Sequence, residues 1–165
     1  MSQSHDSATT KLREQLASFL SWRDAHADLD AALDGLPVAM RGKRPEGMPH
    51  SPWELLEHLR LAQRDILDFC RDPNYVEPTW PDDYWPRDPA PPNDGAWHKS
   101  IEHWRDDRDA MAALARDESI DLFAKIPHGH GQTYIREILL VADHNAYHVA
   151  QIIDARRLLG AWTAS

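Results

Sequence analysis

Cysteine is nearly absent from this chain of 165 residues, which holds a single one, Cys70. One cysteine cannot form an intramolecular disulfide, and a zinc site built from several cysteines is excluded as well. Any metal ion must therefore be held by histidine and carboxylate side chains. We expect Cys70 to be a small buried hydrophobic residue rather than a nucleophile.

Long apolar runs and positive charge are also scarce. The chain contains no apolar stretch of about 18 residues, the length needed to span a bilayer. Residues 1–10 also lack the basic and apolar segments of a secretory signal. Lysine and arginine number 18 against 27 aspartates and glutamates, so the formal net charge is −9. Most of this surface would repel a polyanion. The sequence therefore predicts a cytoplasmic protein that binds neither a membrane nor a nucleic acid.

Alternating runs of β-branched residues, which indicate strands, are missing. Apolar residues instead recur at steps of three and four in four segments, which predicts amphipathic helices. We expect these helices at about residues 10–36, 52–70, 94–116 and 132–159. A chain of this length forms one domain. We therefore predict an all-α four-helix bundle over residues 1–165, with residues 1–9 as a flexible tail.

The clearest helix start is Ser51-Pro52-Trp53-Glu54. It combines a serine N-cap, a proline at the first helical position and a glutamate three residues after the serine. Together these residues form a capping box with its preferred proline. The second helix is therefore expected to begin at Pro52.

A proline-rich connection over residues 71–93 joins the second and third predicted helices. Its prolines are incompatible with a helix. Its aromatic residues favour an ordered loop over a solvated linker, and they are Tyr75, Trp80, Tyr84 and Trp85. A loop of this length either covers a binding pocket or packs over one end of the bundle, and the sequence leaves both alternatives open.

Histidine is abundant, with ten residues, and three of them form a candidate metal site. His144 and His148 are four residues apart on the fourth helix, so their imidazoles stand on one face. His58 lies on the apolar face of the second helix. Three histidines from two helices would leave a coordination position open, as in a catalytic zinc site. The same residues also fit hydrogen-bonded core histidines without any metal.

Several other chemistries are excluded by the residues present. A zinc protease helix needs glutamate directly after its first histidine, where this chain has Asn145. A ferritin-like di-iron site needs paired Glu-x-x-His units, and none occurs. The serine-hydrolase elbow Gly-x-Ser-x-Gly and a glycine-rich phosphate loop are missing too. The chain thus has no evident protein nucleophile of its own, and a reactive group would have to come from the open position of a metal.

Four further residues are candidates for the pocket or for partners of the histidines. His26 falls on the apolar face of the first predicted helix, so it lies in the core or lines a pocket. Gln151, about one turn beyond His148, is placed to hydrogen-bond a substrate or a water molecule. Glu57 and Asp65 are carboxylates that would accept a hydrogen bond from a ligand imidazole.

Three segments of the chain resemble the DinB-like superfamily, also described as DinB/YfiT-like metalloenzymes. They are residues 51–59 (SPWELLEHL), 131–137 (GQTYIRE) and 143–152 (DHNAYHVAQI), which match in order and spacing. The resemblance runs from about His26 to Trp162. It implies a four-helix bundle, frequently dimeric, that holds one divalent metal ion.

In that family the metal, usually zinc or nickel, is bound by three histidines that map onto His58, His144 and His148. Characterised members include thiol-transferases that use bacillithiol or mycothiol, and a maleylpyruvate isomerase. The resemblance therefore implies a homodimeric enzyme whose metal site activates water or a low-molecular-weight thiol, for transfer to a small-molecule substrate or for hydrolysis. The alternative is a non-catalytic metal-binding or stress-associated helical bundle protein.

Overall fold

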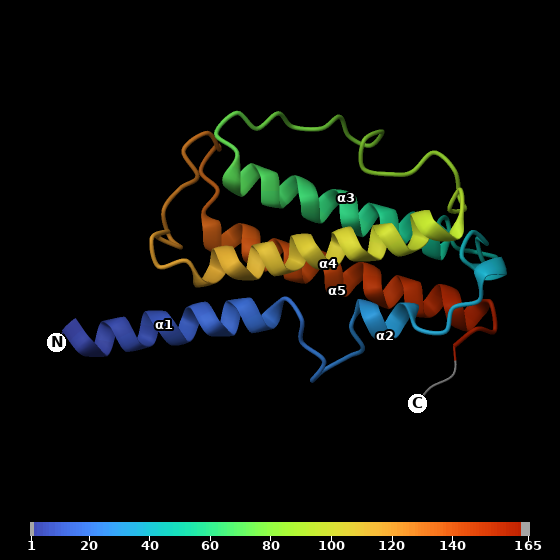
Figure 1. Cartoon of the computed structure of the whole chain (residues 1–165), viewed down its shortest axis with the longest axis horizontal. Coiled ribbons are helices and arrows are strands. Elements are labelled where there is room, and N and C mark those ends of the chain that lie inside the picture. Colours follow the sequence, from blue (N-terminus) through green and yellow to red (C-terminus); the bar gives the residue numbers. More distant parts are fainter. Residues whose placement is uncertain (1, 163–165) are drawn as a thin grey trace.

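The computed structural model describes residues 2–162, and the secondary structure of this part consists of helices joined by loops (Figure 1). The elements are α1 (Ser2–Phe19), α2 (Leu29–Leu33), the 3-10 turn η1 (Val38–Met40), α3 (Pro52–Arg71), α4 (Asp94–Arg116) and α5 (Tyr134–Leu158). Strand pairing in this part is limited to one isolated bridge, between Lys125 and Thr133. The all-α fold class predicted from the sequence is confirmed. None of the helices in residues 2–162 combines the length with the apolar character that a membrane span requires.

The long helices α1, α3, α4 and α5 form a bundle, and the short helix α2 follows α1 on the same side of it. α3 packs against both α4 and α5, while α1 packs mainly against α4 and α2 packs against α5. Figure 1 shows α1 and α2 one after the other along the same side of the bundle, with a connection that bends away between them. The first helix of the bundle is therefore interrupted.

This interruption corrects the prediction of one continuous helix over residues 10–36. The chain leaves α1 after Phe19 and starts a new helix behind Asp28, whose side chain accepts a hydrogen bond from the backbone N–H of Ala31 at 2.9 Å. Arg23 also donates to the Asp28 carboxylate, at 2.5 Å. An aspartate that caps a new helix in this way competes with continuation of the preceding one.

The N-terminal end of the chain also differs from the prediction. Residues 2–9, expected as a flexible tail, are the first turns of α1, and Met1 lies outside the described residues. Extending an existing helix adds one hydrogen bond for each residue fixed, which is easier than starting a new helix. The packed segment around Leu16, which is buried against the core, supplies the helix that these residues extend.

Two apolar clusters hold the bundle together, one toward each end. The first joins α1, the end of α3, the end of α4 and the start of α5, and its fully buried members include Met111, Ala115 and Ile138. The second joins α2, the start of α3, the start of α4 and the end of α5, and it includes Ala32, Leu56, Leu59 and Ile152. The second cluster fixes α3 against α5 at the level of His58 and His148.

Capping interactions confirm the predicted helix starts. Ser51 accepts from the Glu54 backbone N–H at 3.2 Å, and the Glu54 side chain accepts from the Ser51 N–H at 2.8 Å, which completes the capping box. Asn93 caps α4 and Thr133 caps α5. Since α3 starts at a fixed residue, His58 is placed near the end of the second turn.

The connection over residues 72–93 lies along α3 rather than over an end of the bundle (Figure 1). Asp65 on α3 accepts hydrogen bonds from the hydroxyls of Tyr75, at 2.6 Å, and Tyr84, at 2.7 Å. Farther along the loop, the Ser51 hydroxyl donates to the carbonyl of Pro89 at 2.5 Å. These contacts hold the loop on the side of α3 that bears His58.

Candidate metal centre

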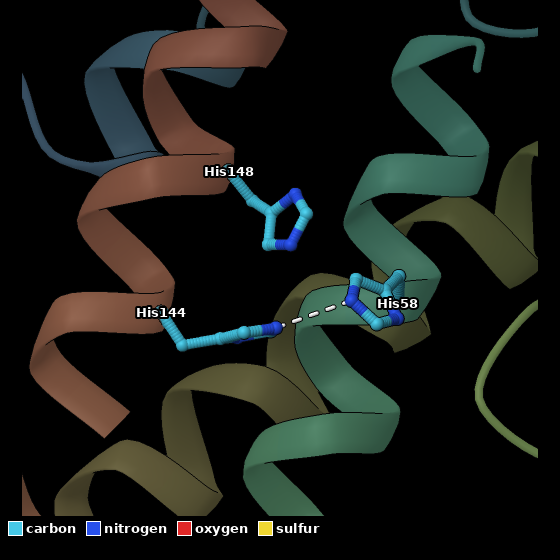
Figure 2. Close-up of side chains that lie close together, drawn as sticks. All are labelled: His58, His144 and His148. Carbon is cyan, nitrogen blue, oxygen red and sulfur yellow. Dashed lines mark hydrogen bonds between the residues drawn. The ribbon is translucent and has the colours of Figure 1, made fainter. Parts of the chain in front are cut away.

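His58, His144 and His148 come together between α3 and α5. Each offers a ring nitrogen, and the three atoms all lie within 4.8 Å of one another. Figure 2 shows the two imidazoles of α5 one above the other, facing the imidazole of α3. The Nε2 atoms of His58 and His144 are 3.1 Å apart. The structure thus brings together the three histidines that the sequence analysis selected.

Neighbouring oxygens orient two of these rings. The Nδ1 atom of His58 lies 2.9 Å from the backbone carbonyl oxygen of Tyr84, and Nδ1 of His148 lies 2.7 Å from Oε1 of Gln151. A carbonyl oxygen only accepts, so each Nδ1 carries the proton and donates it. Each of these two rings then carries its lone pair on Nε2, the form in which a neutral imidazole binds a metal.

His144 has a different environment. Its Nδ1 atom is buried and has no hydrogen-bond partner, while its Nε2 atom faces His58. Because His58 is protonated at Nδ1, its Nε2 accepts a hydrogen bond from the Nε2–H of His144 at 3.1 Å. A metal ion bound by the cluster would replace this hydrogen bond, with the His144 proton on the Nδ1 atom instead.

All three imidazoles are kept neutral by burial. Removal from solvent is the largest cause, and repulsion between histidines a smaller one, of a pKa lowered to about 4 for His58 and about 3 for His144. The hydrogen bond from His58 to the Tyr84 carbonyl opposes the shift of its pKa. The pKa of His148 is lowered by burial too, although its hydrogen bond to Gln151 opposes the shift. Neutral rings are the form that binds metal, so the site is ready for a cation at neutral pH.

The donor set fits a divalent ion. In a tetrahedral site with zinc–nitrogen bonds of about 2.0–2.1 Å, two ligand nitrogens lie roughly 3.3 Å apart. The Nε2 atoms of His58 and His144 already lie 3.1 Å apart. Imidazole nitrogens suit zinc and nickel among other ions, and three protein ligands leave at least one position open. The cluster is therefore compatible with one bound divalent metal ion.

Trp85, from the loop after α3, covers the His58 ring. The two rings stack with centroids 3.9 Å apart and planes inclined by 1°, and the Trp85 ring also stacks on His50 at 3.9 Å. From the sequence, Trp85 was one of several loop aromatics, and His50 was not predicted to lie near the site. The only available signal was the concentration of aromatics between prolines, which does not say which ring reaches the histidines.

Two exposed aromatic side chains stand beside the cluster. The Trp80 ring lies edge-on to His58 at 6.4 Å, and the Tyr147 ring lies edge-on to His148 at 4.9 Å. They are 66% and 62% exposed, which is unusual for large aromatic side chains. Both are thus free to contact a molecule that approaches the histidines.

The other candidate residues lie in different places. Gln151 contacts His148, as described. The carboxylate of Glu57 binds Arg60 and the Ser100 hydroxyl, and that of Asp65 binds the two loop tyrosines. Neither carboxylate has a hydrogen bond to an imidazole of the cluster. Asp65 instead acts on the site through the loop that carries Tyr84 and Trp85.

His26 lies outside the cluster, in the exposed connection between α1 and α2. Its Nδ1 atom is 2.9 Å from the carbonyl oxygen of Ala27, and the residue lines a separate cavity. Cys70 is buried, and burial raises the pKa of its thiol to about 12. The expectation that Cys70 is a buried small residue and not a nucleophile agrees with this environment.

Comparison with known proteins adds one finding. The family model of the DinB superfamily matches residues 21–152, a range that holds all three histidines of the cluster. No curated protein and no solved structure matches the chain.

Proposed function

The chain belongs to the DinB superfamily, and from this premise we propose that it is a metal-dependent enzyme. His58, His144 and His148 would hold one divalent ion, zinc or nickel, and the site would activate water or a low-molecular-weight thiol. The reaction would be transfer of that thiol to a small-molecule substrate, or hydrolysis. The observation that carries the proposal is the convergence of three neutral ring nitrogens within 4.8 Å.

The residues around the cluster have defined tasks in this proposal. The Tyr84 carbonyl and the Gln151 amide oxygen hold the His58 and His148 rings with Nε2 toward the metal position. A divalent ion bound there would lower the pKa of a water or thiol molecule beside it. The chain needs such a source because Cys70, its only thiol, is buried and protonated.

The exposed rings of Trp80 and Tyr147 support a small-molecule substrate. They flank His58 and His148, so an apolar or flat part of a substrate would rest against them while its reactive atom faces the histidines. The stacked Trp85 ring keeps water away from one side of His58. Substrate orientation is therefore assigned to the loop after α3 and to α5.

A non-catalytic metal-binding bundle is the second candidate, and the stacking of Trp85 on His58 favours it. A ring that covers one face of a ligand would suit a closed, purely structural site. The two functions differ in whether a small molecule reaches the metal, which can be measured.

Cobalt substitution separates these functions. The parent protein is loaded with Co(II) and titrated with cysteine and 2-mercaptoethanol, while its visible spectrum is followed. A saturable change in the spectrum, together with thiol transfer to 1-chloro-2,4-dinitrobenzene, supports the enzyme. A cobalt spectrum that neither thiol changes supports the closed site. His144→Ala removes one ligand of the cluster and should lose the cobalt spectrum. His130→Ala removes an exposed histidine outside the cluster and is its matched control.

We also propose that the protein is a homodimer and that it is located in the cytoplasm, where low-molecular-weight thiols are kept reduced. Sedimentation equilibrium measures the assembly directly, because a protomer of 18.9 kDa and a dimer of twice that mass are well separated. A mass of one protomer across micromolar concentrations would remove the dimer from the proposal and leave the metal site unaffected.

A further inference from the structure

Two consecutive residues of the loop after α3 hold the His58 ring, one at its edge and one over its face. The carbonyl oxygen of Tyr84 lies 2.9 Å from Nδ1 at the edge of the ring. The ring of Trp85 covers a face, with centroids 3.9 Å apart and planes inclined by 1°. The hydrogen bond sets the direction in which Nδ1 points, whereas the stacked ring sets the tilt of the imidazole plane. Together the two contacts define the orientation of His58.

His50 extends this stack by a third ring. It stacks on Trp85 with centroids 3.9 Å apart and planes inclined by 15°. Two imidazoles that are both 3.9 Å from the Trp85 ring and nearly parallel to it would overlap on one face, so Trp85 lies between His50 and His58. His50 is half-buried, and burial lowers the pKa of its imidazole against the opposing charge of Glu54. A neutral ring therefore backs Trp85 on the side away from His58.

The backbone at His50 and at Trp85 is held in place as well. His50 directly precedes Ser51, the N-cap of α3, so the start of the helix determines where its side chain emerges. Trp85 precedes Pro86, and a residue before a proline is restricted to extended conformations. Farther along the loop, the Ser51 hydroxyl donates to the carbonyl of Pro89 at 2.5 Å. The two rings are thus presented to each other by fixed segments of chain.

The orientation of the His58 plane matters for a metal bond. The bond forms along the Nε2 lone pair, which lies in the plane of the imidazole ring. A tilt of that plane would turn the lone pair away from the position shared with His144 and His148. A ligand ring leaves its ion by such a movement, so a partner that resists the tilt slows the departure of the ion.

Trp85 is placed to give this resistance. It also lies edge-on to His148, with centroids 6.3 Å apart and planes inclined by 82°, so it borders a candidate ligand from each of two helices. In residues 2–162 the other ring contacts of the three histidines are edge-on, including those of Trp80 and Tyr147. Stacking on a ligand ring is therefore supplied by Trp85, and the ring that backs Trp85 is His50.

We propose that His50 is a positioning residue of the candidate metal centre: it keeps Trp85 stacked on His58 and so slows the release of the bound ion. His50 acts through Trp85 and is not itself a ligand. The inference rests on the proposed function, because it needs an ion held by His58, His144 and His148.

Two substitutions of His50 separate stacking from the filling of space. His50→Leu keeps a side chain of similar size without a flat ring, whereas His50→Phe keeps a ring that can stack. The full chain is loaded with one equivalent of zinc and mixed with an excess of a chromophoric chelator, and the rate of zinc release is measured. We expect release to be about three- to ten-fold faster from His50→Leu and nearly parental from His50→Phe. His130→Leu, at an exposed histidine outside the cluster, is the control and should match the parent.

A second measurement, on the metal-free protein, separates this inference from the proposed function. The indole N–H of Trp85, assigned by its loss in Trp85→Phe, reports the mobility of the ring through its ¹H–¹⁵N heteronuclear NOE. We expect a lower NOE in His50→Leu, because the indole has lost one of the two rings that enclose it. His50→Phe should restore the parental value.

Each arm of the experiment has a result that overturns the inference. Equal zinc release from the parent and His50→Leu, with one zinc bound to each, would overturn it and leave the proposed function intact. Release that is equally fast from His50→Leu and His50→Phe would overturn it too, since a ring would then have no advantage. An unchanged Trp85 NOE in His50→Leu would do so whether or not zinc binds. A parent that binds no zinc would remove the proposed function and the inference with it.

Discussion

The His148 ring has one nitrogen held by Gln151 and the other available for a metal bond. This arrangement requires only local geometry, because Gln151 follows His148 by three residues on the same helix face. Gln151 was predicted to contact a substrate or a water molecule, and its Oε1 instead lies 2.7 Å from Nδ1 of the His148 ring. The choice between these partners depends on side-chain rotation, which spacing along a helix does not determine.

Gln151→Leu should weaken metal binding about 10- to 100-fold, because the His148 ring loses the acceptor that orients it. Gln151→Glu keeps an acceptor at this position, so its metal affinity should be much closer to that of the parent. Competition with a chromophoric chelator measures both affinities. Equal affinities for the parent and Gln151→Leu would contradict the orienting role.

The lowered histidine pKa values predict how the metal-free protein responds to acid. An unfolded histidine titrates near about 6.5, whereas His144 in the folded protein titrates at about 3. The unfolded state therefore takes up protons first as the pH falls, and the stabilisation present above pH 6.5 is lost progressively toward pH 3. For His144 alone the loss reaches about 1 kcal/mol between pH 6.5 and 5.5.

Urea unfolding of chelator-treated protein between pH 7.5 and 5.5 tests this expectation. The free energy of unfolding should fall more steeply with pH for the parent than for His144→Leu, which lacks the titrating ring. Subtraction of the two curves removes the contribution of the carboxylates. Parallel curves would show that burial of His144 does not depress its pKa.

At the scale of elements, helix starts that depend on interactions within a few residues were predicted well from the sequence. The capping box at Ser51 is a sequence pattern that acts within four residues, and α3 starts where this pattern predicts. The interrupted first helix was missed because its apolar spacing continues through the break. Asp28 caps α2, but an aspartate inside an amphipathic segment usually faces solvent, so its capping role was not evident from sequence.

The loop after α3 could not be placed from sequence for a different reason. Its position depends on the hydrogen bonds from Tyr75 and Tyr84 to Asp65, which join residues 10 and 19 positions apart. Composition indicated an ordered loop but carried no information about which acceptor it would meet. The consequence is that Asp65, predicted to contact an imidazole directly, influences His58 through the Tyr84 carbonyl.

Asp65→Ala should release this loop. We expect faster cleavage by a nonspecific protease within residues 72–93 and a metal affinity reduced by up to about ten-fold, since the His58 ring loses its fixed acceptor. Asp68→Ala removes a carboxylate on the same helix that pairs with Arg64 instead, and it serves as the control. Cleavage at equal rates in the two variants would contradict the anchoring role of Asp65.

At the scale of the whole molecule, the candidate site depends on contact between segments far apart in the chain. His58 and His144 are 86 positions apart, and helical periodicity does not say that α3 and α5 are neighbours. The family resemblance supplied that expectation, and the packing of Leu56 and Leu59 with Ile152 provides its physical basis.

A bound ion would also connect α3 to α5 and so stabilise the folded state. A ligand present at 100 times its dissociation constant adds about 2.7 kcal/mol when it binds only the folded protein. Metal binding and stability are therefore two readouts of one claim, that three histidines from two helices hold a single ion.

Metal analysis of protein purified without a histidine tag or chelator tests this claim most directly. The parent and His130→Ala are predicted to contain about one equivalent of zinc or nickel, and His58→Ala, which removes the only ligand from α3, is predicted to lose it. Absence of metal from the parent, with no rise in melting temperature when zinc or nickel is added, would contradict the account. Full metal content in His58→Ala would contradict it as well.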